Sequence, residues 1–271
     1  MIDWELQKEL RQKFNPEGSL LRRQQLRMLE MLKYIDHICL ENDISYWLSS
    51  GTCLGAVRHG GFIPWDDDVD IEMLKKDYDK LLRIIKRDRD CPYILHNHST
   101  DRHFVSPFSK LRDKKSELHE DKGFDLDQKF SGLYIDIFQL ESSNSKKLAL
   151  VGKYLCLMCL SPCLLKNKKI RSVSRKILYF ITYNILRPPI RFLSKIKFRK
   201  DGRLRHSIGN VFIKPRSEKD IFPLKRILFE DSYFNVPNST HDYLKKLYGD
   251  YMRLPSLDDI IIHSSDVKFL D

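Results

Sequence analysis

Residues 49–71 read SSGTCLGAVRHGGFIPWDDDVDI, and this stretch contains the features that decide the fold. Its second half gathers several aspartates just ahead of an apolar segment. Side chains alternate along a β-strand, so Asp68 and Asp70 share one face, as does Asp66 if the strand begins early enough. The apolar residues between them then point into a core. We therefore predict a strand that carries a row of carboxylates on one face.

Carboxylates gathered in this way repel one another unless they are protonated or bound to a cation. Hard oxygen ligands select Mg²⁺ or Mn²⁺, and Mg²⁺ commonly bridges carboxylates to substrate phosphates. A further carboxylate, Asp136, lies in the apolar segment YIDIF, where burying it alone is costly. If this segment pairs beside the first strand, Asp68, Asp70 and Asp136 form one metal site. The alternative is an Asp136 at an exposed sheet edge or hydrogen-bonded to a nearby loop.

A turn of small residues precedes the acidic cluster and is a candidate phosphate cradle. In Ser50, Gly51 and Thr52, backbone N–H groups and hydroxyls at a strand-to-helix turn can hold a phosphate. Downstream, Arg58, His59 and Lys110 are candidates to neutralise the charge of a donor phosphate; surface charges of this kind are also common for solubility alone.

The remaining pattern mixes strands and helices, which is typical of an α/β (α+β) protein. Periodicity predicts helices over residues 20–42, 53–58, 78–87 and 241–248, and strands over residues 44–48, 68–71, 93–97, 103–111 and 133–140. A small-residue turn, then Asp-x-Asp on a strand, then an Asp on a later strand is the order found in the nucleotidyltransferase superfamily. We therefore expect a nucleotidyltransferase-like mixed sheet flanked by helices.

The charge of the chain is concentrated in its middle. The 271 residues carry 48 Lys and Arg against 37 Asp and Glu, a net charge of +11. Residues 142–200 contain fifteen Lys and Arg and no acidic residue, so the other 212 residues sum to −4. A basic surplus suggests an anionic partner. Because the surplus is confined to this segment, the main argument for nucleic acid as the anionic partner is lost.

The same basic segment holds two apolar runs, Leu148–Leu165 and Ile177–Leu186. Basic flanks and long apolar faces predict a helical hairpin in an anionic membrane interface. A buried helical pair with a basic rim fits about as well, whereas Lys153 and Pro162 count against a single membrane span.

Domain organisation and location follow from these patterns. We predict a catalytic core over residues 1–141, a basic apolar helical insert over 142–200, and a C-terminal part over 201–271 that completes the catalytic domain. The six cysteines fit a reducing compartment, and CxxCxxxC at residues 156–163 is better explained by packing than by metal binding. The chain opens with MIDWE rather than an apolar leader, so we expect a cytoplasmic protein at the inner face of the cell membrane.

Two motifs, LGAVRH at residues 54–59 and FIPWDDDVD at residues 62–70, closely resemble the LicD family. The resemblance continues at YIDIF (134–138) and YLKKLYGDYM (243–252), and spans roughly residues 20–255; over 142–220 it has no motif to match. Bacterial LicD proteins are implicated in attaching phosphocholine to surface glycans, and the family is related to fukutin-type ribitol-phosphate transferases. The resemblance implies a nucleotidyltransferase-like fold and a CDP-linked alcohol, typically CDP-choline, as donor.

The expected reaction transfers a phospho-alcohol to a glycan or a lipid-linked glycan and releases CMP. A metal held by Asp68, Asp70 and Asp136 would offset the charge of the diphosphate, and Asp136, in preference to Asp66, would accept the hydroxyl proton. Four aromatic residues are candidates for a quaternary-ammonium cage, although core packing explains each alone: Trp65, Tyr134, Tyr248 and Tyr251. The alternatives are a nucleotidyltransferase that releases pyrophosphate from a triphosphate, and a non-catalytic basic protein that binds nucleic acid.

Overall fold

The computed structural model describes residues 2–118, 125, 127–142, 146–196, 203–207, 209–257, 260 and 267–270. Residues 143–145 and 197–200 of the predicted basic insert, with Lys197, Arg199 and Lys200, lie outside these described residues.

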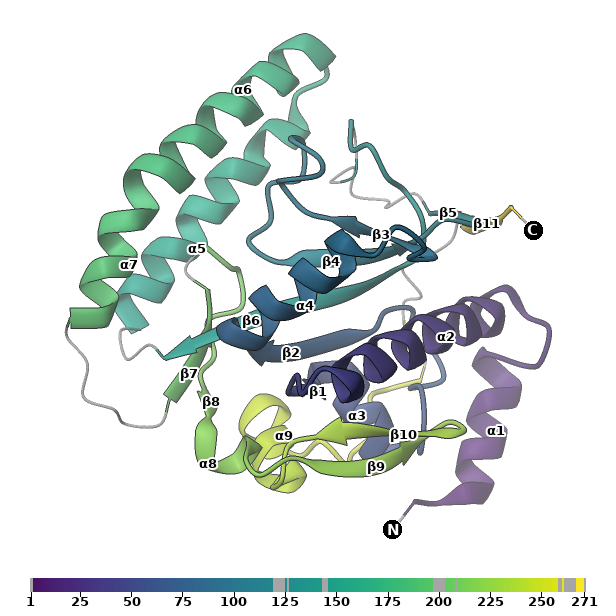
Figure 1. Cartoon of the computed structure of the whole chain (residues 1–271). Helices are drawn as coiled ribbons and strands as arrows, with labels where there is room; N and C mark the ends of the chain where they lie inside the picture. Colours follow the sequence, from purple (N-terminus) through teal and green to yellow (C-terminus); the bar gives the residue numbers. More distant parts are fainter. Residues whose placement is uncertain are drawn as a thin grey trace.

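A curled mixed sheet forms the centre of the molecule (Figure 1). Its strands run in the spatial order β1-β2-β6-β4-β3, and β7 and β8 extend it beyond β6. These strands are β1 (Tyr46–Leu48), β2 (Asp70–Leu74), β3 (Tyr93–His96), β4 (Ser109–Asp113), β6 (Tyr134–Ser142), β7 (Arg203–His206) and β8 (Arg216–Ser217). Only β2 and β6 pair in parallel; the other described pairings of the sheet are antiparallel. The parallel pair lies at the middle of the sheet, where apolar side chains such as Ile71 and Ile137 are fully buried.

Helices pack around this sheet, and two small antiparallel ladders complete the fold. The helices outside the insert are α1 (Trp4–Phe14), α2 (Leu20–Glu41), α3 (Ser50–Arg58), α4 (Lys75–Arg87), α8 (Glu218–Ile221) and α9 (Thr240–Tyr248). The ladders are β9 (Lys225–Phe229) with β10 (Ser232–Val236), and β5 (Ser116–Leu118) with β11 (Val267–Phe269). Helix α2 buries Leu29, Leu32 and Ile35 in the core, because these residues recur at helical spacing.

The helical insert leaves the sheet at the end of β6, and the chain returns to the same strand through β7. It consists of α5 (Lys146–Leu160), the 3₁₀ turn η1 (Ser161–Leu164), α6 (Lys168–Phe180), the π-helical turn η2 (Ile181–Leu186) and α7 (Arg187–Ile196). Helix α5 runs alongside the long helix formed by α6, η2 and α7, and together they project from one side of the core (Figure 1). The segment is thus a helical hairpin, and its placement in a membrane interface stays a prediction.

Several predicted boundaries were wrong. Strand β2 begins at Asp70 rather than Asp68, although the Asp136 N–H already donates to the Val69 carbonyl at 2.9 Å. The small-residue turn at Ser50 is the first turn of α3. The strand predicted over residues 103–111 is β4, which begins at Ser109 because Pro107 cannot donate to a ladder. Helix α1 was not predicted.

Candidate active site

Asp70 and Asp136 lie directly opposite each other on the parallel strands β2 and β6. On the other side of β6, Lys110 of β4 lies opposite Asp136, and its Nζ is 3.5 Å from Asp136 Oδ1. The same ammonium lies 3.1 Å from the ring centroid of Tyr134. The predicted pairing of the two acidic segments is confirmed, and it also brings in Lys110.

The N-terminus of α3 lies against the same carboxylates. The Asp70 N–H donates to Thr52 Oγ1 at 2.8 Å, and the Ser49 N–H donates to the Asp70 carbonyl at 3.0 Å. A Cβ at Gly51 would lie 3.2 Å from Asp66 Oδ2, so glycine allows the carboxylate to approach the helix closely. The first N–H groups of a helix carry partial positive charge. The predicted phosphate cradle is thus adjacent to the aspartates.

Burial first, and mutual repulsion second, raise the pKa values of the aspartates themselves. Burial, and then the charges of Asp67 and Asp136, together raise the pKa of Asp68 to about 6. The pKa values of Asp66 and Asp70 are also raised, by burial first and then by the charge of Asp68. These shifts mean that the site holds more negative charge than its surroundings compensate.

Such a donor set suits a hard divalent cation. Three carboxylates that repel one another gain from a cation that neutralises them, and carboxylate oxygens are the ligands that Mg²⁺ and Mn²⁺ prefer. Among the described residues, however, no three His, Cys, Asp or Glu side chains are arranged as a ready metal-binding group. Metal binding by Asp68, Asp70 and Asp136 therefore stays a prediction that rests on donor chemistry.

Arg58 and His59 are buried behind the cluster. Arg58 Nη1 donates to the carbonyls of Tyr251 at 2.7 Å and Arg253 at 3.3 Å, and Arg58 Nε donates to His59 Nε2 at 2.8 Å. Burial, assisted by the charge of Arg58, lowers the pKa of His59 to about 3, so this imidazole is uncharged at neutral pH. His59 has no exposed surface and lies against Gln7, so these contacts do not favour phosphate binding by His59.

A cavity of about 530 Å³ opens beside the cluster. Its walls include Trp65, Tyr248, Tyr251 and Arg58. Tyr248 links the cavity to the carboxylates, because its side chain hydrogen-bonds to Ser50 and the charge of Asp70 raises its pKa further above the value set by burial. Three of the four aromatic residues predicted for a cage therefore border one cavity, whereas Tyr134 packs against Lys110 and Arg112.

A buried polar centre that the sequence did not predict surrounds Glu72, which is fully buried on β2. Glu72 accepts hydrogen bonds from Trp47 Nε1 at 3.1 Å, from the Arg216 guanidinium at 2.7 and 3.0 Å, and from Tyr243 at 3.1 Å; His206 Nε2 lies 3.0 Å away. Burial opposes the charge of Glu72, but Arg216 and His206 outweigh it and lower its pKa. A lone glutamate in the apolar segment DIEML was the available signal; its partners are far away in sequence.

Tyr243 connects the Glu72 centre to the N-terminus of α3 by hydrogen bonds. Its hydroxyl lies 3.2 Å from Ser49 Oγ and accepts a hydrogen bond from the Ser50 N–H at 3.4 Å. Ser50 has a φ of 46°, in the left-handed region that non-glycine residues rarely adopt. The contacts of Tyr243 thus support the conformation of the predicted phosphate cradle.

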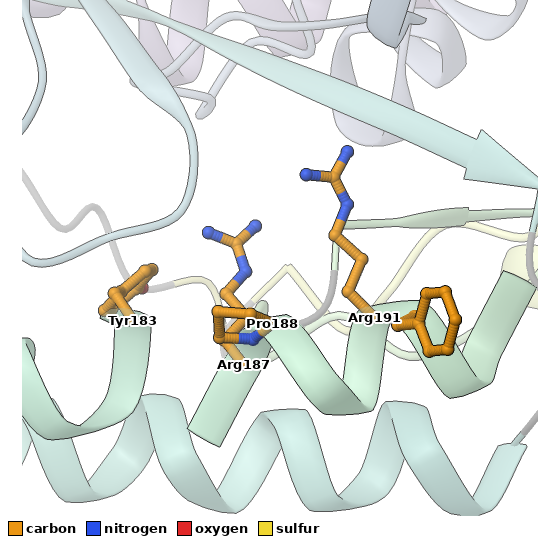
Figure 2. A pocket seen from close by; sticks show the side chains of 5 residues that line it. Tyr183, Arg187, Pro188 and Arg191 are labelled. Atoms are coloured by element: carbon orange, nitrogen blue, oxygen red, sulfur yellow. The ribbon is translucent and has the colours of Figure 1, made fainter. Parts of the chain in front are cut away.

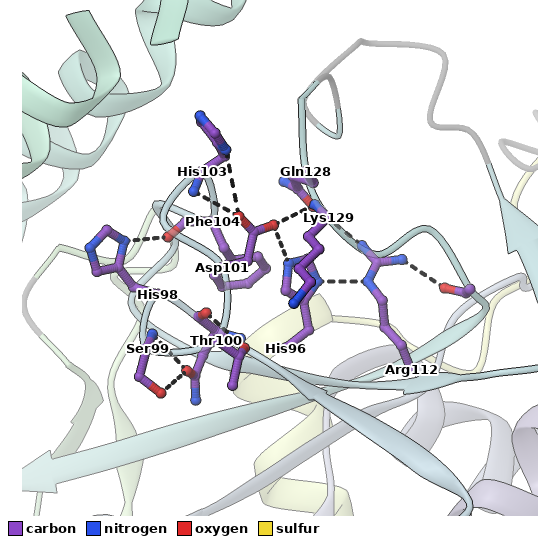
Figure 3. Close-up of polar contacts among 12 residues, drawn as sticks. His96, His98, Ser99, Thr100, Asp101, His103, Phe104, Arg112, Gln128 and Lys129 are labelled. Atoms are coloured by element: carbon purple, nitrogen blue, oxygen red, sulfur yellow. Dashed lines mark hydrogen bonds and ion pairs between the residues drawn. The ribbon is translucent and has the colours of Figure 1, made fainter. Parts of the chain in front are cut away.

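A second buried network supports the strand that carries Lys110 (Figure 3). Arg112 Nε donates to His96 Nδ1 at 2.8 Å, and His96 Nε2 then donates to Asp101 at 3.0 Å. Arg112 Nη1 also donates to the Gly132 carbonyl at 2.7 Å. These contacts connect β3 and β4 to the segment that precedes β6.

Comparisons with known proteins agree with this geometry. Residues 43–151 match the family described as LicD/FKTN/FKRP, nucleotidyltransferase domain. The chain is 28% identical over 255 residues to the lipopolysaccharide cholinephosphotransferase LicD of Haemophilus influenzae, covering 88% of this chain and 94% of that protein. It is 42% identical over 48 residues to the human ribitol 5-phosphate transferase FKRP, covering 18% of this chain and 10% of that protein. The FKRP match is confined to a short segment, whereas the LicD match spans the insert and both flanking parts. Residues 43–151 of this chain therefore contain a domain that matches the LicD family.

Proposed function

We propose that this protein is a metal-dependent phosphotransferase of the LicD type. It moves a phospho-alcohol group, most simply phosphocholine, from a CDP-alcohol to a hydroxyl of a cell-surface glycan or its lipid-linked precursor, and releases CMP. The LicD of Haemophilus influenzae, which is similar along most of the chain, is a lipopolysaccharide cholinephosphotransferase. That similarity supports the transferred group and the class of acceptor.

One observation carries the proposal: Asp70 and Asp136 face each other on parallel strands, next to the N-terminus of α3. Carboxylates beside phosphate-binding N–H groups form a site for a diphosphate and a cation together. The charges of Lys110 and of the α3 N-terminus then hold the donor diphosphate, and the helix orients it through its backbone.

The chain's own residues complete the transfer. The acceptor hydroxyl oxygen attacks the phosphorus that bears the alcohol, a new P–O bond forms, and the bond to the CMP oxygen breaks with its electron pair leaving on CMP. A carboxylate accepts the hydroxyl proton. Lys110 holds Asp136 in an ion pair, and we therefore assign Asp136 to binding positive charge rather than to accepting the proton. Asp66, whose pKa is raised, is the better proton acceptor of the two.

Asp68, Asp70 and Asp136 would hold Mg²⁺ or Mn²⁺. When bound, this cation supplies positive charge that offsets the negative charge of the reacting diphosphate. Lys110 supplies a second positive charge from the opposite side of Asp136.

The cavity beside the cluster accepts the alcohol of the donor. Trp65 and Tyr248 border it, and Asp250 adds a carboxylate. Aromatic faces with a nearby carboxylate suit a quaternary ammonium such as choline. Arg58 also borders the cavity, where its Nη1 donates to the carbonyls of Tyr251 and Arg253 and its Nε donates to His59.

A product assay tests the proposal. Purified protein with Mg²⁺ is incubated with CDP-choline, CDP-ethanolamine or CDP-ribitol and a panel of lipid-linked glycans. We expect CMP and a modified glycan in equal amounts. Pyrophosphate from CTP or ATP, with no CMP from any CDP-alcohol, would instead support a nucleotidyltransferase. Salt-sensitive nucleic-acid binding that persists in Asp68→Ala and Asp70→Ala, without either activity, would support the non-catalytic alternative.

A further inference from the structure

Helix α6 buries charged residues and exposes apolar ones, which is the reverse of a helix that packs on a globular core. Its buried residues are Arg171 and Arg175, the latter 1% exposed, whereas Ile170, Ile177 and Phe180 are each more than half exposed. A helix on a globular core normally buries its apolar face and exposes its charges. The apolar face of α6 therefore points away from the protein.

Specific contacts hold the arginines inside. Arg171 donates to both carboxylate oxygens of Asp127, at 2.6 and 3.0 Å, and Arg175 donates to Cys163 Sγ at 2.8 Å. Further along the same helix, Arg187 and Arg191 extend from one side of the helix toward β6 (Figure 2), and Arg191 pairs with Glu141 at 3.0 Å. The inward face of the insert is thus fixed by polar contacts with the core.

Helix α5 and η1 also expose large apolar residues. Their buried residues are small, and Cys159 Sγ lies 3.6 Å from the Leu178 carbonyl of the neighbouring helix. Large apolar residues follow each other at helical spacing on the other face and are exposed: Leu150, Tyr154, Leu157 and Leu164, the last 82% exposed. Both arms of the hairpin therefore present an uncovered apolar stripe, which is unusual on a soluble surface unless it binds a partner.

The positive charge of the hairpin indicates which kind of partner covers these apolar stripes. Residues 142–200 contain no acidic residue, and the exposed Lys168, Lys169 and Lys176 lie next to the exposed apolar residues in the sequence. A second copy of this chain would bring equal positive charges together, which is unfavourable. An apolar interior beneath an anionic surface matches both properties, and that combination is an anionic lipid bilayer.

The hairpin also has the features of a surface-lying element rather than a span. Lys146–Leu164 is long and apolar enough to cross a membrane by composition, but a third of its most apolar window is buried against the rest of the protein. It contains Lys153 and Pro162, and its inner face packs against the neighbouring helix.

We propose that the α5–α7 hairpin is a docking surface for an anionic membrane, with the apolar stripes in the interface and the lysines at the lipid headgroups. Strand β6 carries Asp136 near its start and leads to the hairpin at its end. The chain therefore leaves the sheet for the hairpin about 20 Å along β6 from Asp136, at roughly 3.3 Å per strand residue.

Vesicle sedimentation of the full-length protein tests this proposal without any need for catalysis. We expect wild-type protein to bind phosphatidylcholine vesicles that contain phosphatidylglycerol, and to bind pure phosphatidylcholine vesicles about tenfold or more weakly. The double variant Val173→Asp, Ile177→Asp should lose about tenfold in binding to the anionic vesicles. The matched control Leu40→Asp, Tyr233→Asp places the same charges at equally exposed apolar sites outside the hairpin and should bind as the wild type does.

A second variant, Lys168→Gln with Lys169→Gln, should weaken binding to the anionic vesicles while leaving the circular dichroism and thermal unfolding unchanged. Equal binding to both vesicle types, or wild-type binding by both hairpin variants, would overturn the proposal. Retention on membranes after both high salt and alkaline carbonate would indicate a span instead. Failure to bind vesicles, together with a dimer that the Asp variant dissociates, would indicate a second copy as the partner.

Discussion

The Tyr243 hydroxyl lies between the Glu72 carboxylate and the N-terminus of α3, 3.1 Å from Glu72 Oε2 and 3.2 Å from Ser49 Oγ. This single hydroxyl connects a fully buried carboxylate of β2 to the turn where Ser50 has a left-handed conformation. The arrangement makes Tyr243 a positioning residue for the predicted phosphate cradle, because it is buried and acts through Ser49 and Ser50.

We therefore expect Tyr243→Phe to raise the KM for the CDP-alcohol donor about tenfold with a smaller effect on kcat, because one or two hydrogen bonds to the cradle are lost. Steady-state kinetics with varied donor concentration measure this. Tyr233→Phe, at an exposed tyrosine of β10, is the matched control and should leave both constants unchanged. A positioning role for Tyr243 would be refuted if Tyr243→Phe and Tyr233→Phe changed kcat and KM by the same amounts.

Glu72→Gln should destabilise the fold by about 3–5 kcal/mol, because the buried Arg216 guanidinium would lose its carboxylate partner. Denaturation by urea gives the free energy of unfolding. Asp231→Asn removes the partner of Lys33 in an exposed ion pair and should cost less than about 1 kcal/mol. A loss at Glu72 no greater than that at Asp231 would mean that the buried centre contributes no more than a surface pair.

Stability at acid pH should depend on Asp101. Burial opposes its charge, but hydrogen bonds from His96 and from the Lys129 and His103 N–H groups outweigh burial and lower its pKa to about 2 from an ordinary 3.8. Because the pKa is lower in the folded state, this stabilisation is present above about pH 4 and is lost as the pH falls toward 2. Asp101→Asn should be less stable than the wild type at pH 6, and the difference should shrink toward pH 2. A difference that is constant between pH 6 and pH 2 would contradict this assignment.

The catalytic core could be predicted well where local sequence carried the signal. The alternation in WDDDVDI placed Asp70 on a strand, and the apolar setting of Asp136 predicted that it pairs there. The Glu72 centre was not foreseeable in detail, because Arg216 and His206 come from a segment without a recognised motif and reach Glu72 only through the return of β7 and β8 to the sheet. The inverted polarity of α6 was also hidden, since a helical pattern does not state which face meets the core.

Within the acidic cluster, neighbouring carboxylates provide a matched comparison. Asp70→Asn should lower the transfer rate about a hundredfold to a thousandfold, because it removes a carboxylate at the point where β2 faces Asp136. Asp67→Asn, three residues earlier, changes a carboxylate that we assign neither to the metal nor to proton transfer, and should retain most of the activity. Chromatographic separation of CMP from the donor measures the transfer rate of both variants.

Metal-dependent phosphocholine transfer is tested most directly by following CMP release and glycan modification together, with CDP-choline as donor and Mg²⁺ present. We expect both products to form in equal amounts, a chelator to abolish them, and Asp70→Asn to suppress both while Asp67→Asn does not. Formation of pyrophosphate from a nucleoside triphosphate, with every CDP-alcohol left intact, would contradict it.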